Sequence, residues 1–200
     1  MRNIYILGGC MRTGKSESAK KAKAMKEEKK EPVKIIESDQ IDKINSPIIR
    51  QLITQTQSGK LTNDTVLTWL KLFQIDNYDT DIILEGPRFK PDVIKIISAN
   101  IDASVYHIKP LVIGYNDPNY FEEFYEILKN TNNWWFIDET AGMNDESQKK
   151  AKMKGLYLDL LVKESNENEI SARGKFKYID VSAYRNFEKR ICKVAENLLN

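Results

Sequence analysis

The chain has 200 residues, 41% of them hydrophobic, which is enough to bury one substantial core and requires no second domain. Its 31 basic and 29 acidic residues leave a formal net charge of +2, too small a value to indicate a nucleic-acid-binding surface. No apolar run approaches the ~20 residues of a membrane span, and the N-terminus lacks a signal-peptide pattern, so we expect a cytoplasmic protein without a membrane partner.

The first predicted elements are a buried strand over residues 4–7 and a helix that begins at Lys15. Between them, residues 9–16 read GCMRTGKS and fit the pattern G-x-x-x-x-G-K-[ST] at every fixed position. Glycines let successive backbone N–H groups converge on phosphate oxygens, and the following helix adds the positive end of its dipole. Lys15 is then expected to reach the β and γ phosphates of ATP, and Ser16 to ligate magnesium. The alternative is a chance glycine turn that Ser16 caps.

The predicted cofactor-binding residues are those of this phosphate loop and one position in the first helical turn: Gly9, Cys10, Met11, Arg12, Thr13, Gly14, Lys15, Ser16 and Ser18. Cys10 and Cys192 lie in different elements and indicate neither a disulfide framework nor a metal cage. A redox role for Cys10 is a further alternative, because a helix N-terminus and a nearby lysine favour the thiolate. His107 is the one histidine, which leaves little material for a histidine triad or a multi-histidine zinc site.

Strand and helix patterns alternate along the rest of the chain. Strands are predicted over residues 32–39, 81–85, 111–115 and 176–181, and helices over 46–74 with a break at 58–59, from 92, over 120–129 and over 184–199. This alternation favours an α/β fold of three layers, in which helices cover both faces of a parallel sheet. Ligands of such a sheet bind at the carboxyl ends of its strands.

Polar side chains at those strand ends would meet in one cleft. Asp39 follows the second strand and can orient or deprotonate an acceptor hydroxyl, or cap the next helix. Glu85 closes the third strand, where it can hold magnesium through water, or remain a surface acid. Arg88 follows a Gly-Pro turn and can grip a phosphate or carboxylate with both arms of its guanidinium, or pair with Glu85. The predicted catalytic residues are Lys15, Asp39 and Arg88, and the predicted metal-binding residues are Ser16 and Glu85.

Trp134 and Trp135 lie between the fourth and fifth predicted strands. They can stack on a base or cover the cleft, but packing inside a short insertion is the favoured interpretation, since aromatic side chains are mainly buried bulk. The lysines nearby, at positions 149, 150, 152 and 154, are interpreted as a solvated helix face.

Five segments, taken in order, make the sequence resemble the P-loop small-molecule kinases, of which adenylate kinase is the best-known branch: GGCMRTGKS, ESD, SGKLTND, LEGPR and YIDVS. Adenylate kinases are similar in carrying a Gly-Asp after the second strand, a Gly-Lys-Leu-Val segment before a helix, and an Asp-Gly-Phe-Pro-Arg turn after the third strand. The similarity covers residues 1–120 and 175–200. It implies a single P-loop NTPase domain over residues 1–200, with a lid or insertion around 130–172.

The resemblance also implies a five-stranded parallel sheet with the order 2-3-1-4-5, ATP and Mg²⁺ as cofactors, and an acceptor pocket beside the second and third strands. It assigns Asp39 to the acceptor side and Arg88 to the anionic group of the acceptor. Lids of the family supply several arginines, whereas residues 90–172 contain none. Either lysines take their place, with Arg173 as a late candidate, or phosphoryl transfer is weak.

The resulting prediction is an ATP- and magnesium-dependent kinase that moves the γ phosphate to a small acceptor, a nucleotide or a similar phosphorylated metabolite. The pattern Glu85-Gly86 followed by Pro91 is also similar to kinases of phosphorylated hydroxy acids, such as 2-phosphoglycerate kinase. A kinase of a sugar nucleotide would share the same motifs. The alternative of a different class is a nucleotide-binding switch without transfer activity, although the lack of an Asn-Lys-x-Asp motif disfavours a GTPase.

Overall fold

The computed structural model describes residues 1–41, 43 and 46–200, and its centre is a parallel sheet. Five strands form this sheet among the described residues: β1 (Arg2–Gly9), β2 (Val33–Glu37), β3 (Asp81–Glu85), β4 (Tyr106–Gly114) and β5 (Lys177–Asp180). Their order is β2-β3-β1-β4-β5, and each pair of neighbours is parallel. The predicted α/β class and strand order are therefore confirmed.

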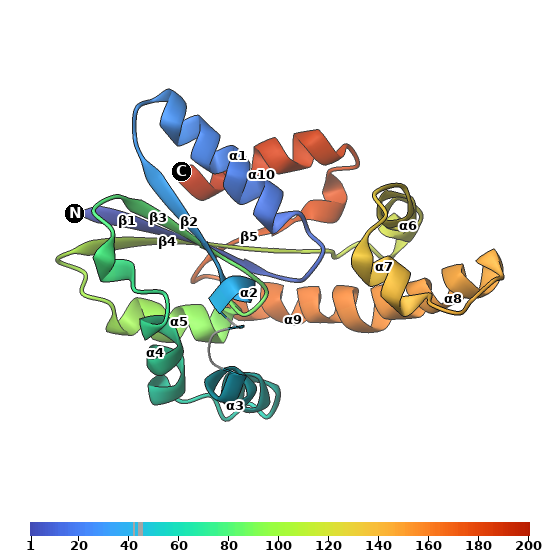
Figure 1. The fold of residues 1–200 in the computed structure, drawn as a ribbon, viewed down its shortest axis with the longest axis horizontal. Coiled ribbons are helices and arrows are strands. Elements are labelled where there is room, and N and C mark those ends of the chain that lie inside the picture. The colour runs from blue at the N-terminus through green and yellow to red at the C-terminus, as the bar shows by residue number, and fades with distance from the viewer. Residues whose placement is uncertain (42, 44–45) are drawn as a thin grey trace.

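Helices cover both faces of the sheet, which gives the three layers (Figure 1). The described helices are α1 (Lys15–Glu28), α2 (Ser38–Ile41), α3 (Ser46–Gln57), α4 (Asn63–Lys71), α5 (Pro91–Asn100), α6 (Phe121–Asn130), α7 (Trp134–Glu139), α8 (Glu146–Leu156), α9 (Lys163–Ala172) and α10 (Phe187–Leu199). α1 and α10 lie together on one face, and α5 and α9 lie on the other (Figure 1). No described helix is long and apolar enough to cross a membrane.

The central strand β1 is buried on both sides, as its near-continuous apolar run predicts. Tyr5 and Leu7 belong to the hydrophobic cluster that includes α1 and α10, whereas Ile4 and Ile6 belong to the cluster that includes α4 and α5. Successive side chains of a strand point to opposite faces, so one short run supplies both cores. The phosphate loop that follows β1 is thereby anchored in the most buried part of the molecule.

Several element boundaries differ from the predicted ones, and two of these differences have a clear physical cause. β4 begins at Tyr106 rather than at 111, because its first half pairs with β1 despite Pro110. β5 pairs with β4 only from Leu111 onward, so no ladder hydrogen bond to β5 is needed from the backbone nitrogen of Pro110. α10 begins at Phe187 rather than at 184, because the side chain of Asn186 accepts a hydrogen bond from the N–H of Lys189 and caps the helix there.

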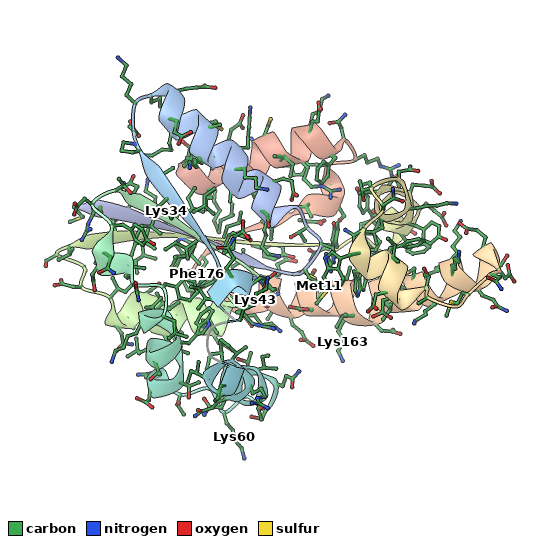
Figure 2. All side chains as sticks on the ribbon, in the orientation of Figure 1. Met11, Lys34, Lys43, Lys60, Lys163 and Phe176 are labelled. Carbon is green, nitrogen blue, oxygen red and sulfur yellow. The ribbon has the colours of Figure 1, made fainter. Side chains whose placement is uncertain are left out.

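Helices α6, α7 and α8 lie at one end of the molecule, to the right in Figure 1. After α7, α8 continues through a π-helical stretch (Tyr157–Val162) into α9, which packs beside α5 and β4. π-helical stretches within α-helices are frequent at functional sites. Met11 of the phosphate loop, labelled in Figure 2, packs against the same hydrophobic cluster as these helices. This end of the molecule therefore adjoins the loop.

Candidate active site

The phosphate loop turns sharply between β1 and α1. Its backbone takes positive φ at Gly9 (104°), Arg12 (62°) and Gly14 (86°), and Gly14 is the N-cap of α1. No side chain of the described residues caps this helix end, so the Ser16 cap that a chance turn would need is not formed. The free N–H groups and the helix dipole make this helix end suitable for an anion.

Lys15 lies buried within the curl of the loop, with only 6% of its surface exposed. Its ammonium group donates to the carbonyl oxygen of Cys10 and, at 3.4 Å, to that of Gly9. Burial lowers the pKa of Lys15, and the negative charges of Glu85 and Asp39 oppose this shift. An anion that approaches a buried cation of this kind stabilises its charged form.

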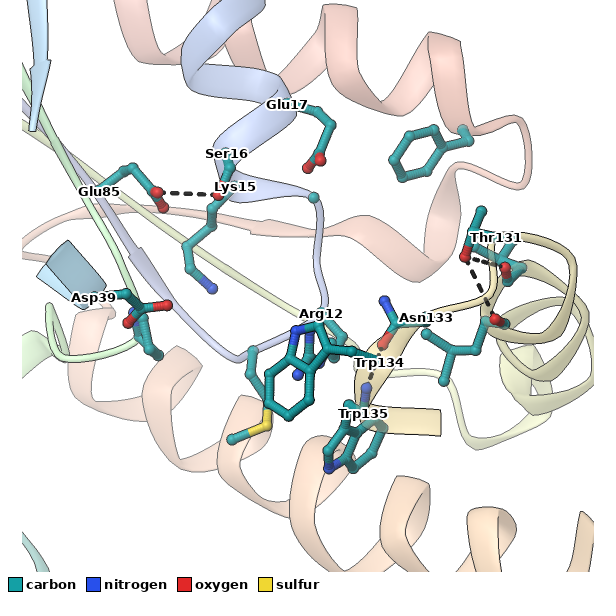
Figure 3. Close-up of a pocket in the computed structure, with 16 residues that line it drawn as sticks. Arg12, Lys15, Ser16, Glu17, Asp39, Glu85, Thr131, Asn133, Trp134 and Trp135 are labelled. Carbon is teal, nitrogen blue, oxygen red and sulfur yellow. Dashed lines mark hydrogen bonds between the residues drawn. The ribbon is translucent and has the colours of Figure 1, made fainter. Parts of the chain in front are cut away.

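Ser16 and Glu85, the predicted metal-binding residues, lie side by side (Figure 3). Ser16 Oγ donates to Glu85 Oε1 at 3.0 Å. Magnesium prefers oxygen donors and takes one or two from the protein when phosphate and water supply the rest, so this pair fits Mg²⁺. Within the described part of the chain, no three His, Cys, Asp or Glu side chains come together as an all-protein metal site.

Glu85 is a buried carboxylate at the end of β3, with 4% of its surface exposed. Burial raises the pKa of the Glu85 carboxyl above the ordinary value of 4.5, although the Ser16 hydrogen bond and the Lys15 charge lower it. The ionised form therefore costs the folded state free energy. Stability contributed by the neutral form is complete below pH 4.5 and is lost as the pH rises through the folded pKa.

We expect Glu85→Gln to raise Tm at pH 7, because a neutral amide oxygen can still accept the Ser16 hydrogen bond while the buried charge is removed. For a chain of this size each kcal/mol corresponds to about 2–4 °C. Thermal unfolding at pH 4 and pH 8 measures the effect, and the gain should be larger at pH 8. The matched control is Glu17→Gln, an exposed carboxylate in the first turn of α1, which should leave Tm unchanged. A lower Tm for Glu85→Gln at pH 8 would contradict the assigned cost of the charge.

A cavity of about 640 Å³ opens over this loop (Figure 3). Its polar floor includes Lys15, Ser16, Glu85 and Asp39. Apolar and aromatic side chains from α6, α7 and the start of α10 form the remainder of the wall: Ile127, Leu128, Trp134, Trp135 and Phe187. The cavity thus combines a charged end with an apolar end, as the binding of a nucleotide requires.

The structure brings Asp39 to this cavity but leaves Arg88 at its margin. Asp39 is exposed in the first turn of α2, inside the helix rather than at its N-cap, so the capping alternative does not hold. Pro87 lines the cavity, whereas Arg88 is half-buried one residue further along the turn and is not among the lining residues. Gly86 precedes Pro87 and has to be glycine, because a Cβ there would lie 1.9 Å from Ser38 Oγ.

The structure bears on three further possibilities that the sequence raised, those for the two tryptophans, for position 18 and for Cys10. Trp135 is 7% exposed and packs in the core as favoured, but Trp134 is 67% exposed and lines the cavity. Ser18 is fully buried and does not line the cavity, whereas its neighbour Glu17 does. Cys10 is buried, and burial raises the pKa of its thiol to about 12, so a thiolate redox role is not supported.

No pattern in the sequence predicted the apolar end of the cavity. Ile127 and Leu128 read as core residues of α6, and Phe187 reads as part of an amphipathic helix. A Cβ placed on Gly14 would lie 2.8 Å from Ile191 Cδ1 and 3.4 Å from Phe187 Cε2, so α10 approaches the loop closely.

No protein-family model and no curated protein matches the chain. Among solved structures, one that it resembles is a gluconokinase from Sinorhizobium meliloti 1021, at 14% sequence identity and a TM-score of 0.48. The match covers 99% of this chain and 91% of that chain. The strand order and the phosphate loop define the class independently of this likeness: the chain has a P-loop NTPase fold with a five-stranded parallel sheet.

Proposed function

We propose that the chain is an ATP- and Mg²⁺-dependent phosphotransferase that moves the γ phosphate to a small acceptor, a nucleotide or a similar phosphorylated metabolite. The observation that supports this most is the Ser16–Glu85 pair, 3.0 Å apart, beside a buried Lys15 and facing the same cavity as Asp39. The adenylate-kinase-like order of motifs supports the same assignment.

In this proposal the loop N–H groups and Lys15 bind the phosphates, and Ser16 and Glu85 hold the magnesium ion, Glu85 through water. When bound, the ion neutralises charge on the β and γ phosphates. An acceptor oxygen forms a bond to the γ phosphorus while the bond from that phosphorus to the β–γ bridging oxygen breaks, and the electron pair leaves with ADP. Where the acceptor is a hydroxyl, Asp39 takes its proton. Positioning and charge neutralisation supply most of the rate enhancement.

An acceptor screen tests the proposal. ATP consumption is measured with magnesium and one metabolite at a time from nucleoside monophosphates, nucleosides, sugar nucleotides and hydroxy acids. We expect slow consumption alone and a sharp rise with one class of acceptor, and a rise with hydroxy acids or sugar nucleotides would move the assignment to those kinases. A nucleotide-dependent switch would bind ATP without any such stimulation, and that result would overturn the transferase assignment.

Arg88 separates donor from acceptor in this proposal, because it directly follows Pro87, which lines the cavity together with Asp39. We expect Arg88→Ala to raise the acceptor KM while leaving ATP binding nearly intact. Loss of a charge-assisted bidentate contact lowers kcat/KM by about 30- to 150-fold. Arg88→Lys should restore only part of it, since lysine lacks the planar fork. Weaker ATP binding with an unchanged acceptor KM would show that the turn serves the donor instead.

A further inference from the structure

Arg12 is, besides Lys15, the one charged residue of the phosphate loop, and its side chain has no role in the mechanism above. Its φ of 62° lies in the left-handed region, which favours glycine and is uncommon for a long side chain. Such a backbone costs roughly 1–2 kcal/mol, and strained residues of this kind cluster at functional sites. The loop therefore keeps an arginine at a position where glycine would fit with less strain.

Two indoles of α7 hold the guanidinium of Arg12. Its central carbon lies 4.3 Å from the ring centroid of Trp134 and 5.5 Å from that of Trp135, both within cation–π range (Figure 3). The start of α7 is fixed in turn, because the side chain of Asn133 accepts a hydrogen bond from the N–H of Trp135 at 3.1 Å. The exposed position of Trp134 is thus explained by the cation that it covers.

The backbone of Arg12 is held from the opposite direction. The hydroxyl of Tyr115, at the end of β4, donates to the carbonyl oxygen of Arg12. Arg190 of α10 is 1% exposed and donates to the same hydroxyl at 3.3 Å. Three elements distant in sequence, β4, α7 and α10, therefore fix one loop residue at both its carbonyl group and its guanidinium.

The guanidinium of Arg12 has at least one N–H donor that is not used in a hydrogen bond. Its Nε is buried and has no hydrogen-bond partner among the described residues. Burial lowers the pKa of Arg12, and the charge of Asp39 opposes this shift, so the guanidinium lies within electrostatic reach of the acceptor-side carboxylate. Buried donors without partners are costly, and a donor placed beside a phosphate loop is satisfied when a phosphate oxygen approaches.

The charged lining of the cavity leaves Arg12 as the cation that is not bonded within the loop. Three carboxylates line it, Glu17, Asp39 and Glu85, against two cations among its lining residues, Lys15 and Arg12. Lys15 is bonded to carbonyl oxygens of the loop. Residues 89–172, which supply the α6 and α7 walls, contain no arginine.

We propose that Arg12 is a catalytic residue whose guanidinium donates hydrogen bonds to the transferred phosphoryl group, and that Trp134 and Trp135 are positioning residues that aim it. The inference rests on the proposed phosphoryl transfer. As the acceptor oxygen bonds to the γ phosphorus and the bond to the bridging oxygen breaks, negative charge spreads over the three remaining oxygens. Arg12 stabilises that charge and keeps its own protons throughout, because a guanidinium does not lose a proton at working pH.

The test compares Arg12→Gln with Arg12→Lys, since both keep a long unbranched side chain at the left-handed position. We expect Arg12→Gln to lower kcat by about 10³-fold while the Kd for MgADP, measured by tryptophan fluorescence, changes less than about tenfold. Arg12→Lys should recover part of kcat, and added guanidinium ion should recover part of it in Arg12→Gln. Arg185→Gln, an exposed arginine that pairs with Glu123, is the matched control and should keep full activity.

Trp134 tests the positioning role separately. Trp134→Ala should lower kcat by about tenfold, the value of a lost cation–π contact, and Trp134→Phe should retain most of the activity. Equal losses in the two variants would overturn the role of the aromatic face. Retention of kcat within tenfold in Arg12→Gln, with Lys15→Ala inactive, would overturn the role of Arg12 and leave the proposed function standing. Absence of both transfer and ATP hydrolysis in the unmodified protein would overturn the two together.

Discussion

Replacing Lys15 by alanine is expected to lower turnover by about 10³-fold or more, to the limit of detection. Lys15 is the buried cation at the base of the loop, with its ammonium group on the carbonyl oxygens of Cys10 and Gly9. In the proposed mechanism it binds the β and γ phosphates, so its loss removes both binding energy and charge stabilisation in the transition state. Steady-state kinetics with the best acceptor from the screen measures the effect.

Lys15→Met is the control for folding. Because burial lowers the pKa of Lys15, its charge costs the folded state free energy, and an apolar side chain of similar length should leave Tm unchanged or higher. The advantage of a neutral side chain at position 15 is complete below the lowered pKa of folded Lys15, declines as the pH rises through that pKa, and is absent above the ordinary lysine pKa of 10.5. A folded but inactive Lys15→Met would establish a chemical role, whereas undiminished turnover in either variant would end the phosphate-loop assignment.

The core of the fold could be predicted because its signals are local. The apolar runs of β1 and β3 are buried on both faces, and such runs mark central parallel strands. The bounds of β3, Asp81–Glu85, were predicted to the residue. The strand order could not be read from periodicity, since nothing local states which strands become neighbours; it followed from resemblance, and the register between β1, β3 and β4 confirms it.

The candidate site likewise contains residues that local sequence signals predict and residues that only the tertiary structure brings together. The loop and Glu85 were predictable, because one is a motif with a required backbone and the other follows a strand whose end must reach that loop. The partners of Arg12 were not predictable from the sequence. Trp134 reaches it from a separate helix, and Tyr115 and Arg190 fix it from β4 and α10, so only the tertiary structure places these side chains together.

The first glycine of the motif, Gly9, is expected to matter to the fold even without a nucleotide. A Cβ there would lie 2.1 Å from the carbonyl oxygen and 2.7 Å from the nitrogen of Ile113, and its φ is 104°. Both atoms belong to the backbone of β4, which β1 and β5 hold on either side, so the clash cannot be relieved by a side-chain rotation. We expect Gly9→Ala to destabilise the protein by more than about 4 kcal/mol.

Gly59→Ala isolates the part of this loss that comes from backbone strain. Gly59 also has positive φ, 67°, but nothing lies within 4 Å of a Cβ built on it. Its substitution should cost only about 1–2 kcal/mol, whereas Gly9→Ala should lower Tm by about 10 °C or more in the absence of nucleotide. If the two variants lost equal stability, contact with β4 would not be what requires glycine at position 9. If Gly9→Ala kept its Tm and lost only MgADP binding, the glycine would serve the phosphates alone, and the packing of the loop against β4 would have to be looser than 2.1 Å implies.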